Sequence, residues 1–92
     1  MLKVDSCGID VGCKEFVLTL RREGKREPTR KKFSNGESGR RGVCRYLSKP
    51  GHLVRVCMES TGNYGLDLAV ELDSCDGVEV MVANPRAVRR FA

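Results

Sequence analysis

The sequence lacks the features that mark a membrane, secreted or zinc-binding protein. No apolar run approaches the roughly 18 residues of a membrane-spanning helix, and the N-terminus has no apolar secretion signal. The five cysteines form no CxxC pair, their number is odd, and most of them lie within apolar stretches. We therefore expect a cytoplasmic protein with no membrane association, whose cysteines are reduced, buried thiols and form neither disulfides nor a zinc site.

Histidine and aromatic residues are also scarce, which limits the available chemistry. The only histidine, His52, lies in a loop beside proline and glycine, and we assign it no role. Because Ser6, Ser60 and Thr61 have no suitably placed histidine partner, a nucleophilic triad is not supported. The most basic stretch of the chain contains no aromatic residue, and this disfavours binding of single strands by base stacking.

The positive charge is concentrated in the first half of the chain. A length of 92 residues allows a single domain, 1–92, and its net charge is +5. Residues 1–50 hold 13 Lys and Arg against 6 Asp and Glu, a net charge of +7, whereas residues 51–92 have a net charge of −2. Between positions 21 and 32, seven basic residues accompany two acidic ones. This stretch is either a solvated hairpin tip or a polyanion contact, and charge alone favours neither.

The candidate nucleic-acid contacts follow from this distribution. They are Lys14, Arg21, Arg22, Lys25, Arg26, Arg30, Lys31 and Lys32, with Arg86, Arg89 and Arg90 near the C-terminus. Lys14 has two interpretations, because a lysine in an exposed turn needs no ligand to explain it. The arginines near the C-terminus belong to a predicted helix, and they lie off the face that carries its apolar residues.

The hydrophobic pattern predicts strands first and then strands alternating with helices. We expect strands at 7–11, 15–20 and 28–33, a helix at 38–48, a strand at 53–58, a helix ending at Gly77, a strand at 78–83 and a third helix starting at Asn84. The strand at 53–58 is almost continuously apolar, so we expect it to be buried on both faces. This order predicts an α/β fold with a mixed sheet, antiparallel on one side, parallel on the other and covered by helices.

Two acidic residues are candidates for a shared site. Asp10 lies within the first expected strand, and Glu59 directly follows the apolar strand. If these two strands are parallel neighbours, both side chains reach the same end of the sheet, where α/β proteins bind ligands. Carboxylates about 4 Å apart repel by roughly 4 kcal/mol at an effective dielectric constant of 20, so we expect a proton or cation between them. Oxygen ligands without suitably spaced His or Cys favour Mg²⁺ or Mn²⁺ over zinc.

Each carboxylate also has an alternative interpretation when it is taken alone. Asp10 could accept backbone hydrogen bonds in the adjacent turn, and Glu59 could mark the start of a helix ahead of Thr61. The metal-site hypothesis is favoured because one topology brings both residues to the same place.

Four segments of the chain carry a family resemblance. They are GIDVGCKEF at 8–16, the F-x-N-x-x-x-G element of Phe33, Asn35 and Gly39, MESTGNY at 58–64, and VANPRAVRRFA at 82–92. In this order and spacing they resemble the DEDD-type transposases of bacterial insertion sequences, the insertion-sequence-110 family that includes the Piv invertase. The combination covers nearly the whole chain, and no single segment would suffice.

The resemblance implies a fold, a metal and a reaction. It implies a RuvC-like domain of ribonuclease H-like fold with a mixed five-stranded sheet, of which residues 1–92 form a part that ends in the last helix. Asp10 and Glu59 then stand at the first two acidic positions of the DEDD set, as ligands of Mg²⁺ or Mn²⁺ in the cleavage and strand transfer of insertion-sequence DNA. The family's other two aspartates and its serine-bearing second domain are not among these residues. We therefore expect the isolated chain to be inactive, with metal bound weakly if at all.

The implied partners are nucleic acids. DNA is the expected substrate, and family members use a structured guide RNA to choose target and donor DNA. The alternative is a non-catalytic basic module that binds DNA or RNA through the 21–32 segment and the C-terminal arginines. A third outcome is an inert domain that self-associates through the surface of the third helix.

Overall fold

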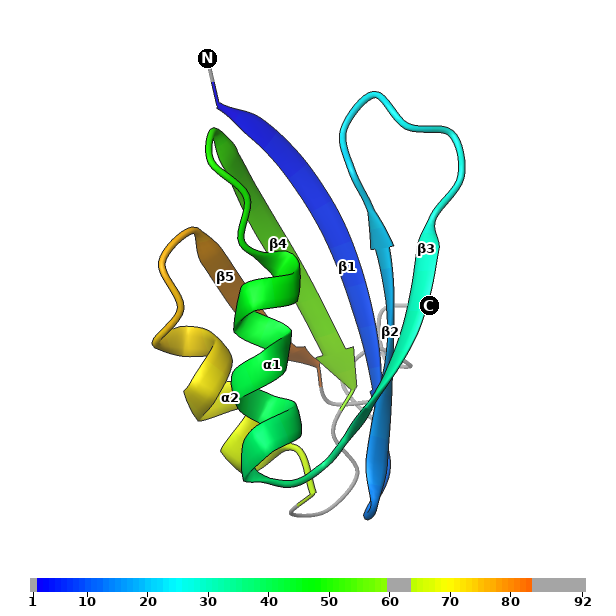
Figure 1. The fold of residues 1–92 in the computed structure, drawn as a ribbon, viewed down its shortest axis with the longest axis vertical. Coiled ribbons are helices and arrows are strands. Elements are labelled where there is room, and N and C mark those ends of the chain that lie inside the picture. The colour runs from blue at the N-terminus through cyan, green and yellow to red at the C-terminus, as the bar shows by residue number, and fades with distance from the viewer. Residues whose placement is uncertain (1, 60–63, 84–92) are drawn as a thin grey trace.

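A single sheet with two helices accounts for the described part of the chain. The computed structural model describes residues 2–59 and 64–83 (Figure 1). Its elements are β1 (Lys3–Val11), β2 (Glu15–Arg21), β3 (Thr29–Ser34), α1 (Glu37–Leu47), β4 (His52–Glu59), α2 (Leu66–Asp73) and β5 (Val78–Ala83). The helix predicted from Asn84 lies outside the described residues. In the part of the chain that is described, neither helix has the length and apolar character needed to cross a membrane.

The sheet is mixed, as predicted. Its strand order is β3-β2-β1-β4-β5. The pairs β1–β2 and β2–β3 are antiparallel, whereas β1–β4 and β4–β5 are parallel. The α/β class and the five-stranded mixed sheet are therefore confirmed. The central pair is β1 and β4, the two strands that carry the candidate carboxylates.

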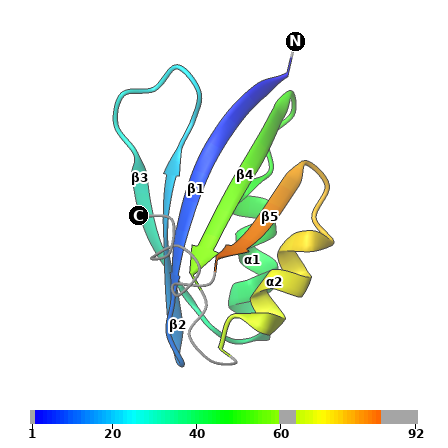
Figure 2. The ribbon, with the colours of Figure 1, turned by 180° about the vertical axis from the view of Figure 1, so that it is seen from behind.

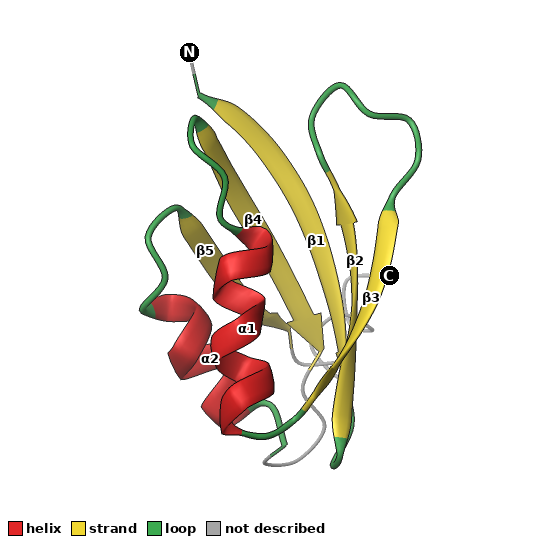
Figure 3. Ribbon diagram, in the orientation of Figure 1, coloured by secondary structure: helices red, strands yellow, loops and turns green. Residues whose placement is uncertain are grey.

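Both helices pack on one face of the sheet and form the core with it (Figure 3). Burial alternates along the strands, so that every second residue of β1 from Asp5 to Val11 points toward the helices. The fully buried apolar side chains are Phe16, Leu18, Val43, Leu47, Val54, Met58, Leu68 and Leu72. Each such side chain contributes roughly 1.5–3 kcal/mol of transfer free energy, which fixes the strands against α1 and α2.

The opposite face of the sheet is open among the described residues (Figure 2). In β4, Val54, Val56 and Met58 are buried, but Arg55, Cys57 and Glu59 are exposed. The prediction that this strand is buried on both faces is therefore wrong. Its alternation is that of a strand with one solvated face, and the arginine within the apolar run was the signal for it. The apolar character came partly from Cys57, a residue type that is often buried.

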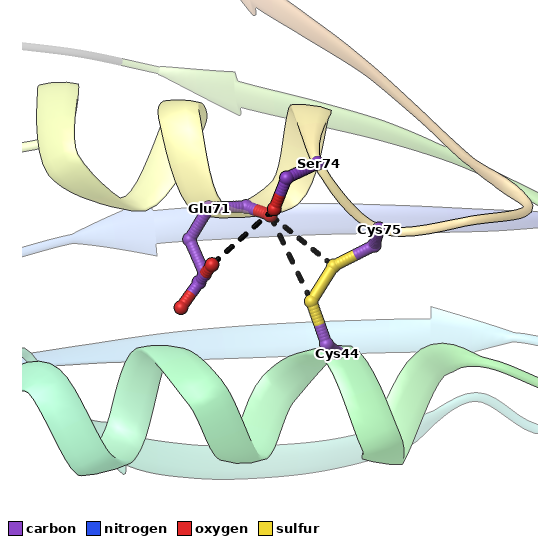
Figure 4. The surroundings of a disulfide bond; sticks show 4 residues. All are labelled: Cys44, Glu71, Ser74 and Cys75. Carbon is purple, nitrogen blue, oxygen red and sulfur yellow. Dashed lines mark hydrogen bonds between the residues drawn. A yellow bond between two sulfur atoms is a disulfide. The ribbon is translucent and has the colours of Figure 1, made fainter.

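The cysteine prediction is also corrected. Cys44 of α1 and Cys75, just after α2, form a disulfide, with 5.9 Å between their Cα atoms (Figure 4). The two helices pack side by side, which brings together residues that are 31 positions apart. Cys13 and Cys57 are exposed. Only Cys7 matches the prediction, since it is a buried thiol whose pKa is raised by burial to about 12.

Candidate functional site

The central strand pair places the two candidate carboxylates side by side. In the parallel register of β1 and β4, Asp10 is the direct partner of Glu59. Paired residues of neighbouring strands project from the same face, with the strands about 5 Å apart. Both residues are exposed on the open face and line one depression of about 480 Å³. The juxtaposition that the predicted topology required is therefore present.

Local structure holds each carboxylate at the end of a rigid strand. After Asp10 the chain turns tightly, with the Gly12 N–H donating to the Glu15 carbonyl at 2.9 Å. A Cβ atom at Gly12 would lie 3.1 Å from that same carbonyl oxygen, which leaves little room for a side chain. Glu59 follows Met58, which is fully buried and fixes the end of β4 in the core. Both side chains therefore begin from backbone that packing and hydrogen bonds hold in place.

The electrostatics of the pair differ from the expectation in one respect. Among residues 2–59 and 64–83, neither Asp10 nor Glu59 has an ion pair or a side-chain hydrogen bond. Because both are exposed, water screens their repulsion toward the roughly 1 kcal/mol that unit charges 4 Å apart have in bulk solvent. Exposure therefore lowers the cost of placing the two carboxylates side by side, and the cation between them remains a prediction.

The donor set fits a hard divalent cation only in part. Asp10 and Glu59 supply carboxylate oxygens, the ligands that Mg²⁺ and Mn²⁺ prefer, and Mg²⁺ commonly binds through one or two carboxylates with waters completing its shell. Within the described ranges, no cluster of three or more His, Cys, Asp or Glu residues is positioned to bind a metal ion. Two carboxylates alone would bind such a cation weakly.

The predicted basic residues do not form one surface. Arg21, Arg30 and Lys32 belong to the open face, because the register pairs them with Ser6 of β1 and with Thr19 and Val17 of β2. Arg30 lines the same depression as the two carboxylates. Lys14, Lys25 and Arg26 are exposed in loops. Arg86, Arg89 and Arg90 lie outside the described residues.

Lys31 lies on the other side of β3. Its Nζ atom is 5.6 Å from the ring centre of Phe33 and 5.0 Å from that of Tyr46, a cation–π arrangement on the helix side of the sheet. Lys31 therefore does not share a face with Arg30, its neighbour in the sequence.

Arg22 requires a correction. Its Nη1 atom lies 2.8 Å from Asp5 Oδ2 and also donates to the Leu47 carbonyl at 2.9 Å, while Nη2 donates to the Tyr46 carbonyl at 3.2 Å. The Arg22 side chain is only 19% exposed. Its guanidinium fastens the end of β2 to the end of α1, so it is not free to contact a nucleic acid.

The buried partner of Arg22 is a residue that sequence reasoning missed. Asp5 has no exposed surface, and it accepts hydrogen bonds from Arg22 and from the Glu23 N–H, both at 2.8 Å. His52 Nδ1 lies 2.8 Å from the same carboxylate, so the histidine given no role is part of this cluster. Burial alone would raise the pKa of Asp5, but the bonds from Arg22, Glu23 and His52 outweigh it and lower that pKa.

A sequence signal for this cluster did exist. Side chains of a strand alternate between its two faces, and Asp5 lies on the same face of β1 as Cys7, Ile9 and Val11, which are all buried. An acidic residue at an inward position needs a buried cation or several donors, because an unpaired buried charge is costly. The inward position of Asp5 therefore predicts that its carboxylate has hydrogen-bond or ionic partners, although it does not identify those residues.

Comparison with known proteins gives a family and a distant structural likeness. A family model described as a transposase, of the DEDD type found in insertion-sequence-110 elements, matches residues 7–92. No match is found among proteins of curated function. Two solved structures of the Ppx/GppA family protein of Aquifex aeolicus align with TM-scores of 0.47, at 14% and 13% identity, over 92% and 98% of this chain. The chain spans 37% and 38% of those proteins, and a likeness at this level carries no functional argument.

Proposed function

This chain belongs to the insertion-sequence-110 family of DEDD transposases, and on that premise we propose that it is the N-terminal, metal-binding part of a DNA transposase. The observation that supports the proposal most is the direct register of Asp10 with Glu59 on neighbouring parallel strands. In the proposal, the sheet with its two helices is part of a RuvC-like domain of ribonuclease H-like fold. Asp10 and Glu59 are then the first two acidic ligands of that domain's metal site.

The proposed chemistry is cleavage and strand transfer of insertion-sequence DNA. When bound, Mg²⁺ or Mn²⁺ would activate the attacking oxygen and stabilise the leaving oxygen of a phosphodiester. The chain's own contribution is to present two carboxylate oxygens from rigid strand ends. Arg30, on the wall of the same depression, would attract a phosphate to the carboxylates, where it would otherwise be repelled.

This proposal makes different predictions for the whole transposase and for residues 1–92. In a transposase that contains this domain, Asp10→Asn and Glu59→Gln should each abolish strand cleavage while DNA binding, measured by gel shift, is retained. Undiminished cleavage by either variant would contradict the proposal. Residues 1–92 alone should not cut DNA, because two ligands hold a metal ion poorly. Metal-dependent cutting by that chain, lost in Glu59→Gln, would show that the two carboxylates suffice.

A second candidate function is nucleic-acid binding without catalysis. It is favoured by the exposed basic residues of the open face, Arg21 and Arg30, and of the adjoining loop, Lys25 and Arg26. Phosphate contacts release counterions, so affinity for DNA should fall steeply with salt. Arg30→Gln should reduce the slope of log K against log salt by about 1, whereas Arg45→Gln, on the exposed side of α1, should leave it unchanged.

A partner beyond DNA belongs to the proposal alone. We propose that the same basic residues also contact a structured guide RNA, which would compete with DNA for this domain. Self-association is tested separately by light scattering at increasing protein concentration. A chain that binds neither DNA nor RNA at low salt would contradict the binding proposal.

A further inference from the structure

The F-x-N-x-x-x-G element lies between β3 and α1 and adds no charge to the proposed metal site. Phe33 belongs to the core, where its ring stacks on Phe16 with 5.4 Å between centroids and meets Tyr46 edge-on at 5.7 Å. Gly39 permits the first turn of α1 to approach the end of β3, because a Cβ atom there would overlap the backbone carbonyl of Ser34. These two residues explain the packing of the element but give no role to its asparagine.

Asn35 makes hydrogen bonds to two separate segments of the chain. Its Nδ2 atom donates to the Gly12 carbonyl at 2.9 Å and to the Tyr64 carbonyl at 3.0 Å. Its backbone N–H donates to the Lys14 carbonyl at 2.8 Å. On the other side, Arg40 Nη1 lies 3.3 Å from both Asn35 Oδ1 and the Asn35 carbonyl oxygen. Because Arg40 donates to the amide oxygen, the amide nitrogen faces the two carbonyls and can donate one N–H to each.

Both segments lie C-terminal to a candidate carboxylate in the sequence. Gly12 comes two residues after Asp10, in the turn that ends β1, and Tyr64 comes five residues after Glu59. One side-chain amide therefore joins the chain that leaves the first carboxylate to the chain that leaves the second. A carboxylate at position 35 would have no N–H to donate, and a hydroxyl would have one, so the two-donor amide suits this position.

We propose that Asn35 is a positioning residue for the Asp10–Glu59 pair: its bonds to the carbonyls of Gly12, Lys14 and Tyr64 hold the turn after Asp10 in place, and with it the placement of Asp10 beside Glu59 for binding a divalent cation. The inference rests on the proposed metal-binding function. Asn35 itself contacts neither carboxylate, so its effect on Asp10 is transmitted through the backbone of the turn at Gly12 and Lys14. Arg40 supports it by orienting the amide.

The test uses the 92-residue chain labelled with ¹⁵N and titrated with Mn²⁺, whose paramagnetism broadens nearby amide signals. Asn35→Ala should weaken Mn²⁺ binding on the order of tenfold, as loss of supporting hydrogen bonds does at other metal sites. Arg40→Ala should cause a smaller loss in the same direction. The control is His52→Ala, which removes a hydrogen bond at the opposite end of β4 and should lower stability without changing Mn²⁺ affinity.

A metal-free measurement keeps the inference testable by itself. Without Mn²⁺, amide exchange in Asn35→Ala should accelerate in the 10–15 segment and at Tyr64 more than in the core of β1, because those segments have lost their anchor. Unchanged exchange there, or Mn²⁺ affinity in Asn35→Ala that equals wild type, would overturn the inference while leaving the metal site intact. If the wild-type chain shows no Mn²⁺ effect near Asp10, the exchange measurement alone decides the role of Asn35, whereas the proposed function is decided by the cleavage assays of Asp10→Asn and Glu59→Gln in a transposase that contains this domain.

Discussion

Strand β1 carries one carboxylate near each end, and the two have opposite surroundings. Asp5 points toward the helices, has no exposed surface and is bonded to Arg22, Glu23 and His52. Asp10 points to the open face, is exposed, and has another carboxylate, Glu59, as its direct partner in the register. Within residues 2–59 and 64–83, β1 therefore has a compensated acid near its start, matched by hydrogen-bond donors, and at its end an uncompensated pair of acids without such partners. Figure 1 shows the course of this strand.

This difference separates a structural role from a functional one. Folding requires that a buried charge be matched by hydrogen-bond partners, and Asp5 has them from two parts of the chain, Arg22 with Glu23 and His52. Nothing in folding requires two carboxylates to be adjacent, and their repulsion opposes the native state slightly. Uncompensated like charges at the end of a rigid strand pair are therefore the better candidate for binding a ligand of opposite charge.

The largest expected effect is at the compensated end. Arg22→Ala would leave the Asp5 carboxylate buried without its main cation, and we expect the free energy of unfolding to fall by roughly 2–3 kcal/mol. This is below the usual range for broken buried pairs, because His52 remains and Arg22 is 19% exposed. Urea denaturation followed by circular dichroism measures the change. A loss below about 0.5 kcal/mol would mean that the cluster does not hold the fold together.

The second largest effect is expected from a fall in pH, which should lower the stability contributed by the cluster around Asp5. The pKa of Asp5 is lowered in the folded chain from its ordinary value of 3.8, so the unfolded chain binds a proton more readily. The stability that this cluster contributes is then present above about pH 4 and is lost as the pH falls through the lowered pKa. Asp5→Asn should remove this part of the acid dependence, measured as the urea midpoint between pH 5 and pH 2. Asp10→Asn should retain it, and loss of the dependence in Asp10→Asn would reverse the assignment of the two ends.

The smallest expected effect on stability is at the uncompensated end. Glu59→Gln removes one of two adjacent exposed charges, so the free energy of unfolding should stay the same or rise by less than about 1 kcal/mol. The same urea titration, at low salt and again at 0.5 M NaCl, measures it, and salt should shrink any gain. A destabilisation above about 1 kcal/mol would indicate that Glu59 has a structural partner.

The α/β class and the mixed sheet of the described residues could be predicted from the sequence because the relevant patterns are local. Alternation and helical spacing predict each strand and helix, and the meander followed by strand–helix alternation predicts which strands pair. If the first and fourth strands are parallel neighbours, that topology places Asp10 and Glu59 at the same end of the sheet, and the structure adds their direct register. The exposed face of β4 was missed because Val54, Val56, Cys57 and Met58 made the strand read as uniformly apolar, although Arg55 interrupts it.

What could not be predicted depends on contacts between distant positions. The partners of Asp5 lie at positions 22, 23 and 52, and nothing local marks Arg22 as different from its exposed neighbour Arg21. The Cys44–Cys75 disulfide likewise arises from the packing of α1 against α2, which brings together residues 31 positions apart. The hydrogen bonds of Asn35 follow only once the turn after β1 and the segment after β4 are placed in space.

The central claim is that the uncompensated pair binds a divalent cation, and the most direct test is to map where Mn²⁺ acts on the ¹⁵N-labelled chain. Broadening should centre on the amides around Asp10 and Glu59, be reversed by excess Mg²⁺, and disappear in Asp10→Asn. The region around Asp5 should be unaffected. Broadening centred elsewhere, or unchanged in both Asp10→Asn and Glu59→Gln, would contradict the account.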